Sequence, residues 1–164
     1  MRTLFLLRHA KAENAAPGSS DPDRALNERG RQAAQTMGKY VKKKNLTFDL
    51  VLCSTALRAR ETAESLLAAA EMVVTVDYDQ RIYEASPGQL LEVISEVKDE
   101  LRNVLLVGHN PGMEELIRTL TDELEQISPC TLAKIDYDGR EWSRVAENKG
   151  KLEWIVRPKD LVED

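Results

Sequence analysis

Three short, mainly apolar runs, separated by segments with helical periodicity, constrain the fold of this chain more than any other feature. They are Leu4–Leu7, Asp49–Cys53 and Val104–Val107. Apolar runs without strict alternation are typical of strands that are buried on both faces of a mostly parallel sheet. A weaker, β-branched candidate strand is Val73–Val76. The pattern therefore predicts a sheet whose two faces are both covered.

Apolar residues between these runs recur at helical spacing and predict four amphipathic helices. Asn27 is placed to cap the first of these helices. Strands that alternate with helices predict an α/β fold, a three-layer sandwich with a mostly parallel central sheet and helices on both faces. The four apolar stripes are Ala33, Ala34, Met37 and Val41; Ala59, Ala63, Leu66, Leu67 and Ala70; Leu90, Leu91, Ile94, Val97 and Leu101; and Met113, Leu116, Ile117, Leu120 and Leu124.

The C-terminal part of the chain has a different pattern. Residues Thr131–Tyr137, an Asp138-Gly139 turn and the segment from Glu141 predict a β-hairpin. Residues Leu152–Val156 predict a further strand before Pro158. We therefore expect antiparallel strands after the alternating part of the chain.

Polar residues that can take part in catalysis or anion binding follow each predicted strand. In a parallel sheet the carboxyl ends of the strands share one edge, and ligands bind there. Guanidinium groups pair with phosphate oxygens, and helix N-termini supply unpaired N–H donors. The topology therefore predicts an anion site at this edge, built from Arg8, His9, Arg58, Glu84 and His109.

Composition and charge exclude several classes of protein. The net charge of −5 opposes nonspecific binding to nucleic acid, which needs an excess of Lys and Arg. No run approaches the roughly 20 apolar residues of a transmembrane helix, and the apolar stretch after Thr3 is too short for a signal peptide. We therefore expect a cytoplasmic protein with no nucleic-acid or membrane partner. A length of 164 residues is typical of one domain, so we expect residues 1–164 to form a single domain.

Other phosphate-handling and nucleophilic motifs are missing from the sequence. It contains no G-x-x-x-x-G-K-[ST], G-x-G-x-x-G or G-x-S-x-G segment. Cys53 is followed by Arg58 and Arg60, whereas a cysteine phosphatase loop needs arginine at the position of Ala59, so we expect Cys53 to be a buried structural residue. Two cysteines and two histidines are too few for a disulfide framework or a multi-histidine metal centre, and we expect no metal and no cofactor.

Several segments, in order along the chain, resemble the histidine phosphatase superfamily, also called the phosphoglycerate mutase-like superfamily. Leu7–Ala10 resembles its R-H-G signature, and Asp23–Gly30 its D-x-R-x-L-T-x-x-G segment. Ser54–Ala63 resembles its S-P-x-x-R-A-x-x-T-A block, and Val107–Gly112 its second-histidine block. The tail Trp154–Leu161 is similar to the end of the SixA-like phosphohistidine phosphatases.

The resemblance implies a role for each matching residue. His9 would attack phosphorus and form a transient phosphohistidine, which divides one difficult displacement into two steps. Arg8, Arg58 and His109 would surround the transferring phosphoryl group and stabilise its charge. Arg24 would add a fourth phosphate contact by analogy with the SixA type, or else form an ion pair in its own polar loop. The family mechanism needs no metal.

The role of Glu84 and the substrate stay open at this stage. Arg81–Glu84 resembles the segment that carries the general acid in mutases and broad phosphatases. Protonation helps an alkoxide to leave, whereas a protonated imidazole leaves readily without it. Glu84 is therefore either that acid or a solvated carboxylate that can pair with an arginine.

The resemblance and the length of the chain favour a phosphohistidine on a protein as the substrate, for example on a histidine phosphotransfer domain. About twenty residues separate Glu84 from the last strand of the alternating part, too few for a large lid. A small phosphate ester is the first alternative, which Glu84 favours, and a non-catalytic phospho-ligand-binding module is the second. A mutase is disfavoured because Asn14 lies one position before its expected place. Small, turn-forming residues predict a mobile loop within residues 14–23.

Overall fold

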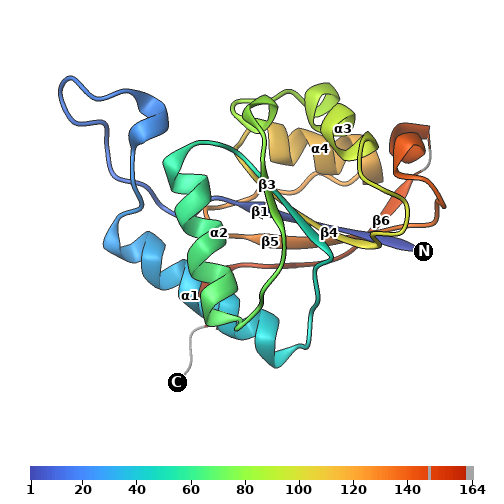
Figure 1. The fold of residues 1–164 in the computed structure, drawn as a ribbon, viewed down its shortest axis with the longest axis horizontal. Helices are drawn as coiled ribbons and strands as arrows, with labels where there is room; N and C mark the ends of the chain where they lie inside the picture. The colour runs from blue at the N-terminus through green and yellow to red at the C-terminus, as the bar shows by residue number, and fades with distance from the viewer. Residues whose placement is uncertain (148, 162–164) are drawn as a thin grey trace.

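The computed structural model describes residues 1–147 and 149–161. Its centre is a six-stranded sheet in the order β3-β2-β4-β1-β5-β6 (Figure 1). Strands β3, β2, β4 and β1 are parallel, β5 pairs antiparallel with β1, and β6 pairs antiparallel with β5. The strands are β1 Arg2–Arg8, β2 Leu50–Cys53, β3 Val76–Tyr78, β4 Asn103–Gly108, β5 Leu132–Tyr137 and β6 Gly150–Val156.

Helices cover both faces of the sheet, which confirms the predicted three-layer α/β fold (Figure 1). Successive residues of β1 point to opposite faces, so Leu4 and Leu6 pack in one core and Phe5 and Leu7 in the other. The first core lies under α3 and α4, and the second under α1 and α2. The helices are α1 Glu28–Lys43, α2 Leu57–Ala69, α3 Pro87–Ser95 and α4 Gly112–Thr121.

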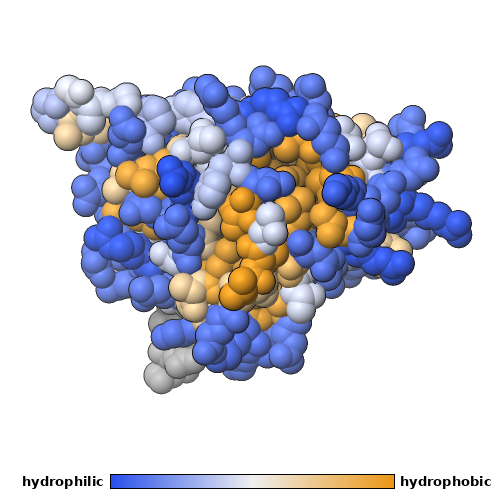
Figure 2. Space-filling model, viewed as in Figure 1, coloured by the Kyte–Doolittle hydropathy of each residue, from blue (hydrophilic) through white to orange (hydrophobic). Residues whose placement is uncertain are grey.

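Few large apolar side chains of the described residues are exposed, because the apolar stripes of the helices face the sheet. In the view of Figure 2, hydrophilic residues surround the apolar ones that gather near the centre of the face. None of the helices within 1–147 and 149–161 is long and apolar enough to cross a bilayer.

The start of α1 forms as the sequence predicts. Asn27 caps the helix, and its side-chain oxygen accepts a hydrogen bond from the Gly30 N–H at 2.8 Å. A Cβ atom on Gly30 would lie 2.1 Å from the backbone oxygen of Lys11. Only glycine therefore lets the chain that leaves the end of β1 pass so close to the first turn of α1.

Two of the predicted apolar stripes extend beyond the helices that form. The α3 helix ends at Ser95, before Leu101. The α4 helix ends at Thr121 because Asp122 adopts a left-handed conformation with φ of 63°. Leu124, predicted to continue the α4 stripe, is instead 75% exposed.

The predicted hairpin turn at Asp138-Gly139 is wrong. The partner of β5 is β6, and the segment between them contains the 3-10 helix Trp142–Glu147. Trp142 is fully buried against the α3 side of the sheet and donates its indole N–H to the Leu101 oxygen at 2.6 Å. Burial of this large ring takes the segment out of the sheet. The strand predicted at 152–156 is confirmed within β6.

The weak strand candidate at residues 73–76 is displaced along the chain. The strand that forms is β3, Val76–Tyr78. Val73 is fully exposed. The β-branched run alone therefore placed the strand too early, since pairing with β2 begins only at Val76.

Candidate active site

Both histidines of the chain lie side by side at the carboxyl edge of the sheet. Arg8 ends β1 and pairs in register with Gly108, which ends β4, so His9 and His109 leave neighbouring parallel strands at the same level. The His9 N–H donates to the Gly108 oxygen at 3.0 Å. The centroids of the two imidazole rings are 5.1 Å apart.

All the residues that the sequence predicts for the site line one pocket of about 360 Å³. Arg58 reaches it from the first turn of α2, Arg24 from the loop before α1, and Glu84 from the connection between β3 and α3. The pocket is lined by Arg8, His9, Lys11, Ala12, Asp21, Arg24, Arg58, Glu84, His109, Asn110 and Pro129. The fold therefore brings these segments, which are distant in the sequence, together at the carboxyl edge of the sheet, where the topology predicts them.

The hydrogen bonds of His9 define its tautomer. Its Nδ1 lies 2.7 Å from the Ala10 oxygen, which can only accept, so Nδ1 carries the proton and Nε2 has the free electron pair. The Ala10 N–H in turn donates to the Thr62 hydroxyl at 2.9 Å, and Thr62 donates to the Arg58 oxygen at 2.7 Å. These bonds tie the end of β1 to the first turns of α2.

Burial and positive charge keep both imidazoles neutral. Burial is the main cause that lowers the pKa of His9 to about 4, and Arg58, Arg8 and Arg24 lower it further, against the opposing bond to Ala10. The pKa of His109 falls to about 3, mainly through burial and then through His9 and Arg58. At neutral pH both rings are therefore uncharged.

His109 is held by Ser54, which follows β2. The Nε2 of His109 lies 2.7 Å from the Ser54 hydroxyl, and that oxygen also accepts from the Ala56 N–H at 3.2 Å. The Nδ1 of His109 is buried and makes no hydrogen bond within the described part of the chain. The edge of the Tyr83 ring packs on the imidazole with centroids 5.4 Å apart.

Arg8 is fixed at the back of the pocket. It donates from Nη1 to the Ile127 oxygen at 2.8 Å. Burial lowers the pKa of its guanidinium, and Glu114 opposes this effect. Its Nε is buried without a hydrogen bond among residues 1–147 and 149–161.

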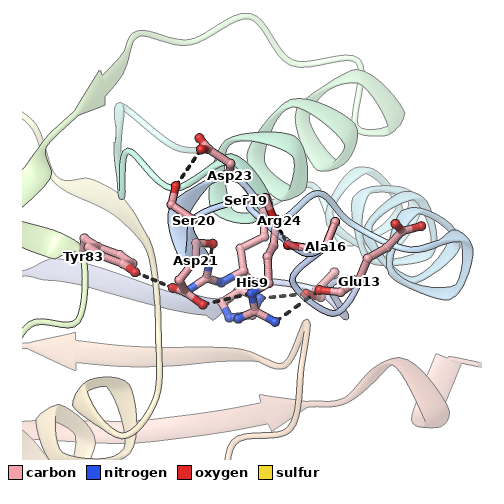
Figure 3. Close-up of polar contacts among 11 residues, drawn as sticks. His9, Glu13, Ala16, Ser19, Ser20, Asp21, Asp23, Arg24 and Tyr83 are labelled. Carbon is pink, nitrogen blue, oxygen red and sulfur yellow. Dashed lines mark hydrogen bonds and ion pairs between the residues drawn. The ribbon is translucent and has the colours of Figure 1, made fainter.

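Arg24 and Arg58 share one carboxylate, that of Asp21, which Figure 3 shows in contact with Tyr83. The Arg24 Nε lies 2.9 Å from Asp21 Oδ1, and the Arg58 Nη2 lies 3.0 Å from Asp21 Oδ2. The Tyr83 hydroxyl donates to the same carboxylate. The pKa of Asp21 falls to about 2, first through Tyr83 and then through Arg58 and Arg24. Arg24 thus both lines the pocket and forms the ion pair that its polar loop suggested.

Asp21 and Tyr83 were missed as site residues in the sequence. Asp21 was visible only as a possible ion-pair partner of Arg24, and Tyr83 only as the neighbour of Glu84. Neither follows a strand directly, so the rule that found the other residues does not select them. The acidic residue three positions before Arg24 is a signal that could have found Asp21, whereas the sequence carries no comparable signal for Tyr83.

Glu84 lies at the mouth of the pocket with its side chain exposed to solvent. Its backbone is in the left-handed region with φ of 49°, which is uncommon for a non-glycine residue. No hydrogen bond or ion pair restrains its carboxylate within the described residues. The structure therefore leaves Glu84 free to meet a ligand at the rim, but not held against the two histidines.

We expect the stability of the protein to fall between pH 8 and pH 5 because of the two buried histidines. In the unfolded chain their pKa is about 6.5, whereas folding lowers it to about 4 and about 3. Below pH 6.5 the unfolded state therefore binds protons that the folded state does not, and the free energy of unfolding falls by about 1–2 kcal/mol for each histidine at pH 5. Urea unfolding of wild type and of His9→Asn at both pH values measures this. An equal pH dependence in the two proteins would contradict it.

Comparison with known families agrees with the motifs. The profile of the histidine phosphatase superfamily (branch 1) matches residues 4–102. The chain belongs to this superfamily. The superfamily that the sequence motifs suggested is therefore confirmed, and the second-histidine segment Val107–Gly112 lies outside the matched residues.

Solved structures share the fold of this chain over nearly its whole length. The candidate phosphohistidine phosphatase SixA of Nakamurella multipartitia superposes with a TM-score of 0.85 at 29% identity, covering 96% of both chains. That of Agrobacterium tumefaciens has a TM-score of 0.83 at 31% identity, covering 96% of this chain and 98% of its own. Both relatives therefore share the architecture of this chain as well as part of its sequence.

A curated relative covers less of the protein. An uncharacterized protein of Mycobacterium tuberculosis (strain ATCC 25618 / H37Rv) is 41% identical over 111 residues. That match spans 67% of this chain and 66% of the relative. The chain therefore spans just under two thirds of that relative's length.

Proposed function

We propose that this histidine phosphatase removes phosphate through a phosphohistidine on His9, without a metal, and that its substrate is a phosphohistidine on a protein. We further take residues 1–164 as one catalytic domain. The observation that carries the mechanism is the bond between His9 Nδ1 and the Ala10 oxygen at 2.7 Å. It leaves Nε2 unprotonated beside His109 and the pocket arginines.

In the first step, His9 Nε2 attacks phosphorus, the N–P bond forms and the bond to the leaving group breaks. His9 must be neutral for this attack, and its pKa of about 4 satisfies that requirement at pH 7. The burial that lowers the pKa also removes the cost of stripping water from the nucleophile during the reaction.

Arg8, Arg58 and His109 stabilise the charge of the transferring phosphoryl group. Guanidinium N–H groups match phosphate oxygens in pairs. Since the Ser54 oxygen accepts from Ala56, its own proton is free to point at His109 Nε2. His109 then carries its proton on Nδ1, the nitrogen that has no protein partner in the described part, and donates it to the phosphoryl group.

In the second step, water attacks phosphorus, the N–P bond breaks and inorganic phosphate leaves. The electron pair of that bond returns to His9 Nε2, which restores the neutral imidazole. Every group needed for both steps belongs to the pocket, and no step calls on a metal ion.

The substrate proposal rests on the surroundings of the pocket. Between Glu84 and the start of β4 the chain forms only α3 and short connections, and α3 packs on the sheet. No segment there folds over the histidines, so a loop or helix of a phosphorylated protein can approach. The SixA-type relatives support the same substrate class.

A small phosphate ester is the second candidate substrate, and the position of Glu84 favours it. The exposed carboxyl group at the pocket mouth could protonate an alkoxide as it leaves. A phosphohistidine substrate does not need this acid, because its imidazole leaves readily once protonated. The two substrates therefore differ in their dependence on Glu84.

We expect Glu84→Gln to leave hydrolysis of a phosphorylated histidine phosphotransfer domain within about twofold of wild type, because a general acid adds little when the leaving group is already good. Initial rates of phosphate loss from that domain and from an aryl phosphate test this. Wild type should dephosphorylate the domain much faster than the ester. A faster ester reaction, together with a fall of about tenfold or more for Glu84→Gln on the ester, would instead favour the small-molecule enzyme. No turnover on either substrate would favour the remaining alternative, a non-catalytic phospho-ligand-binding module.

A further inference from the structure

The Asp21 carboxylate occupies the anion-binding face of two pocket arginines, Arg24 and Arg58. Both Nη atoms of Arg58 bond to this residue, Nη2 to the carboxylate at 3.0 Å and Nη1 to the backbone oxygen at 2.9 Å. Arg24 donates to the other carboxylate oxygen at 2.9 Å, and Tyr83 donates its hydroxyl proton. One acidic side chain thus uses donors that the proposed mechanism assigns to phosphate.

Asp21 lies on the solvent side of Arg58. The Arg58 side chain is 5% exposed and that of Asp21 is 43% exposed, so the carboxylate is the accessible member of this ion pair. Because its side chain is already half-exposed, Asp21 can turn into solvent and gain hydration in place of its bonds to the arginines.

Asp21 belongs to a strap, which we define as residues 12–24. The base of the strap is closed by pairing of Ala12 with Leu26 and by the Glu13 N–H bond to Ala25 at 2.8 Å. Residues 13–20 are all exposed, and the strap projects from the body at the upper left of Figure 1. Its hydrogen bonds to α2 and to the β3–α3 connection all involve Asp21.

We propose that Asp21 is an internal anion that competes with the phosphoryl group for Arg58 and Arg24, so that substrate binding displaces it and releases the strap. This rests on the proposed function only in assigning these arginines to phosphate. A carboxylate and a phosphoryl oxygen are equivalent acceptors for a guanidinium. A phosphoryl dianion brings two charges where Asp21 brings one, and the two anions repel each other on a shared arginine.

Competition of this kind makes Asp21 a specificity-determining residue. A ligand displaces Asp21 only if it interacts with the two arginines more favourably than the carboxylate does. Doubly charged tetrahedral groups meet that condition, whereas singly charged ones gain little from the exchange. The strap thus selects phosphoryl groups over the carboxylates of a protein surface that approaches the pocket.

The test is calorimetric binding of inorganic phosphate at pH 8 to wild type, Asp21→Asn and Asp23→Asn. Asp23 is the matched control, since it lies on the same strap and its carboxylate bonds to the Ser20 hydroxyl at 2.6 Å and to no pocket residue. We expect Asp21→Asn to lower the Kd for phosphate about fivefold, because the binding-competent fraction rises. Asp23→Asn, with the same change of net charge, should alter the Kd less than about 1.5-fold, because the charge of Asp23 acts on the pocket only across solvent, where salt screens it.

A second variant separates competition from positioning. Tyr83→Phe keeps the ring against His109 and removes only the hydroxyl that holds Asp21, so it should lower the Kd about twofold. Weaker phosphate binding by Asp21→Asn would show that the carboxylate positions the arginines, and would overturn the proposal. Equal effects of Asp21→Asn and Asp23→Asn would also overturn it. The binding assay needs no turnover, so an inactive wild type would refute the proposed function while leaving this inference testable.

Discussion

Replacing His9 with alanine is expected to abolish turnover, with a fall in kcat of at least about 10³-fold on any phosphorylated substrate. His9 supplies the only unprotonated nitrogen of the described pocket that both faces the arginines and has its tautomer fixed by a backbone oxygen. His109 cannot replace it, because its Nε2 is bonded to Ser54. Without His9 no covalent intermediate can form, and direct attack by water is left as the slow route.

The measurement is phosphate release from an aryl phosphate in excess chelator, with wild type beside His9→Ala. Wild-type turnover should survive the chelator, because the proposed steps use only side chains of the pocket. With a radiolabelled phosphate group on the substrate, rapid quenching should trap labelled phosphate on the wild type as an acid-labile phosphoramidate. The variant should carry no label. Unfolding curves of the two proteins serve as the control for folding. Turnover that persists in His9→Ala, or that stops in chelator and returns with a divalent metal, would contradict the mechanism.

The positions of the two histidines could be predicted because they depend on topology alone. Each follows an apolar run that becomes a parallel strand, and the register of β1 with β4 then brings them together. Arg58 could be predicted for the same reason, as a residue of the helix that follows β2. Such placements depend on strand direction, which the alternation of apolar runs with helical segments predicts.

Features that depend on a loop conformation could not be predicted in this way. Asp21 meets Arg58 only because the strap folds back on itself, and its loop composition predicts mobility rather than a contact. Trp142 likewise takes the chain out of the expected hairpin because its ring packs in the core beside α3. In both cases a side chain's tertiary partner overrides the local turn or loop preference of the sequence.

Replacing Arg58 with alanine is expected to lower kcat/KM about 10²- to 10³-fold, because a preorganised charge in a buried site stabilises the transferring phosphoryl group. Arg60→Ala is the matched control. It removes the same charge two residues along α2, where the guanidinium is exposed and lies over the Tyr78 ring at 5.1 Å from its centroid. Steady-state kinetics on the phosphorylated phosphotransfer domain should show a change of less than about twofold for Arg60→Ala, since an exposed charge contributes little.

The loss in Arg58→Ala has two parts that a further substitution separates. The variant removes a phosphate ligand, and it also leaves the Asp21 carboxylate without its main buried partner, at the mouth of an anion site. Adding Asp21→Asn to Arg58→Ala should therefore recover several-fold of the lost kcat/KM, because residues in contact act non-additively. Equal losses for Arg58→Ala and Arg60→Ala would show that the effect is long-range charge. A double variant no better than Arg58→Ala would show that Asp21 does not oppose the substrate once its arginine is gone.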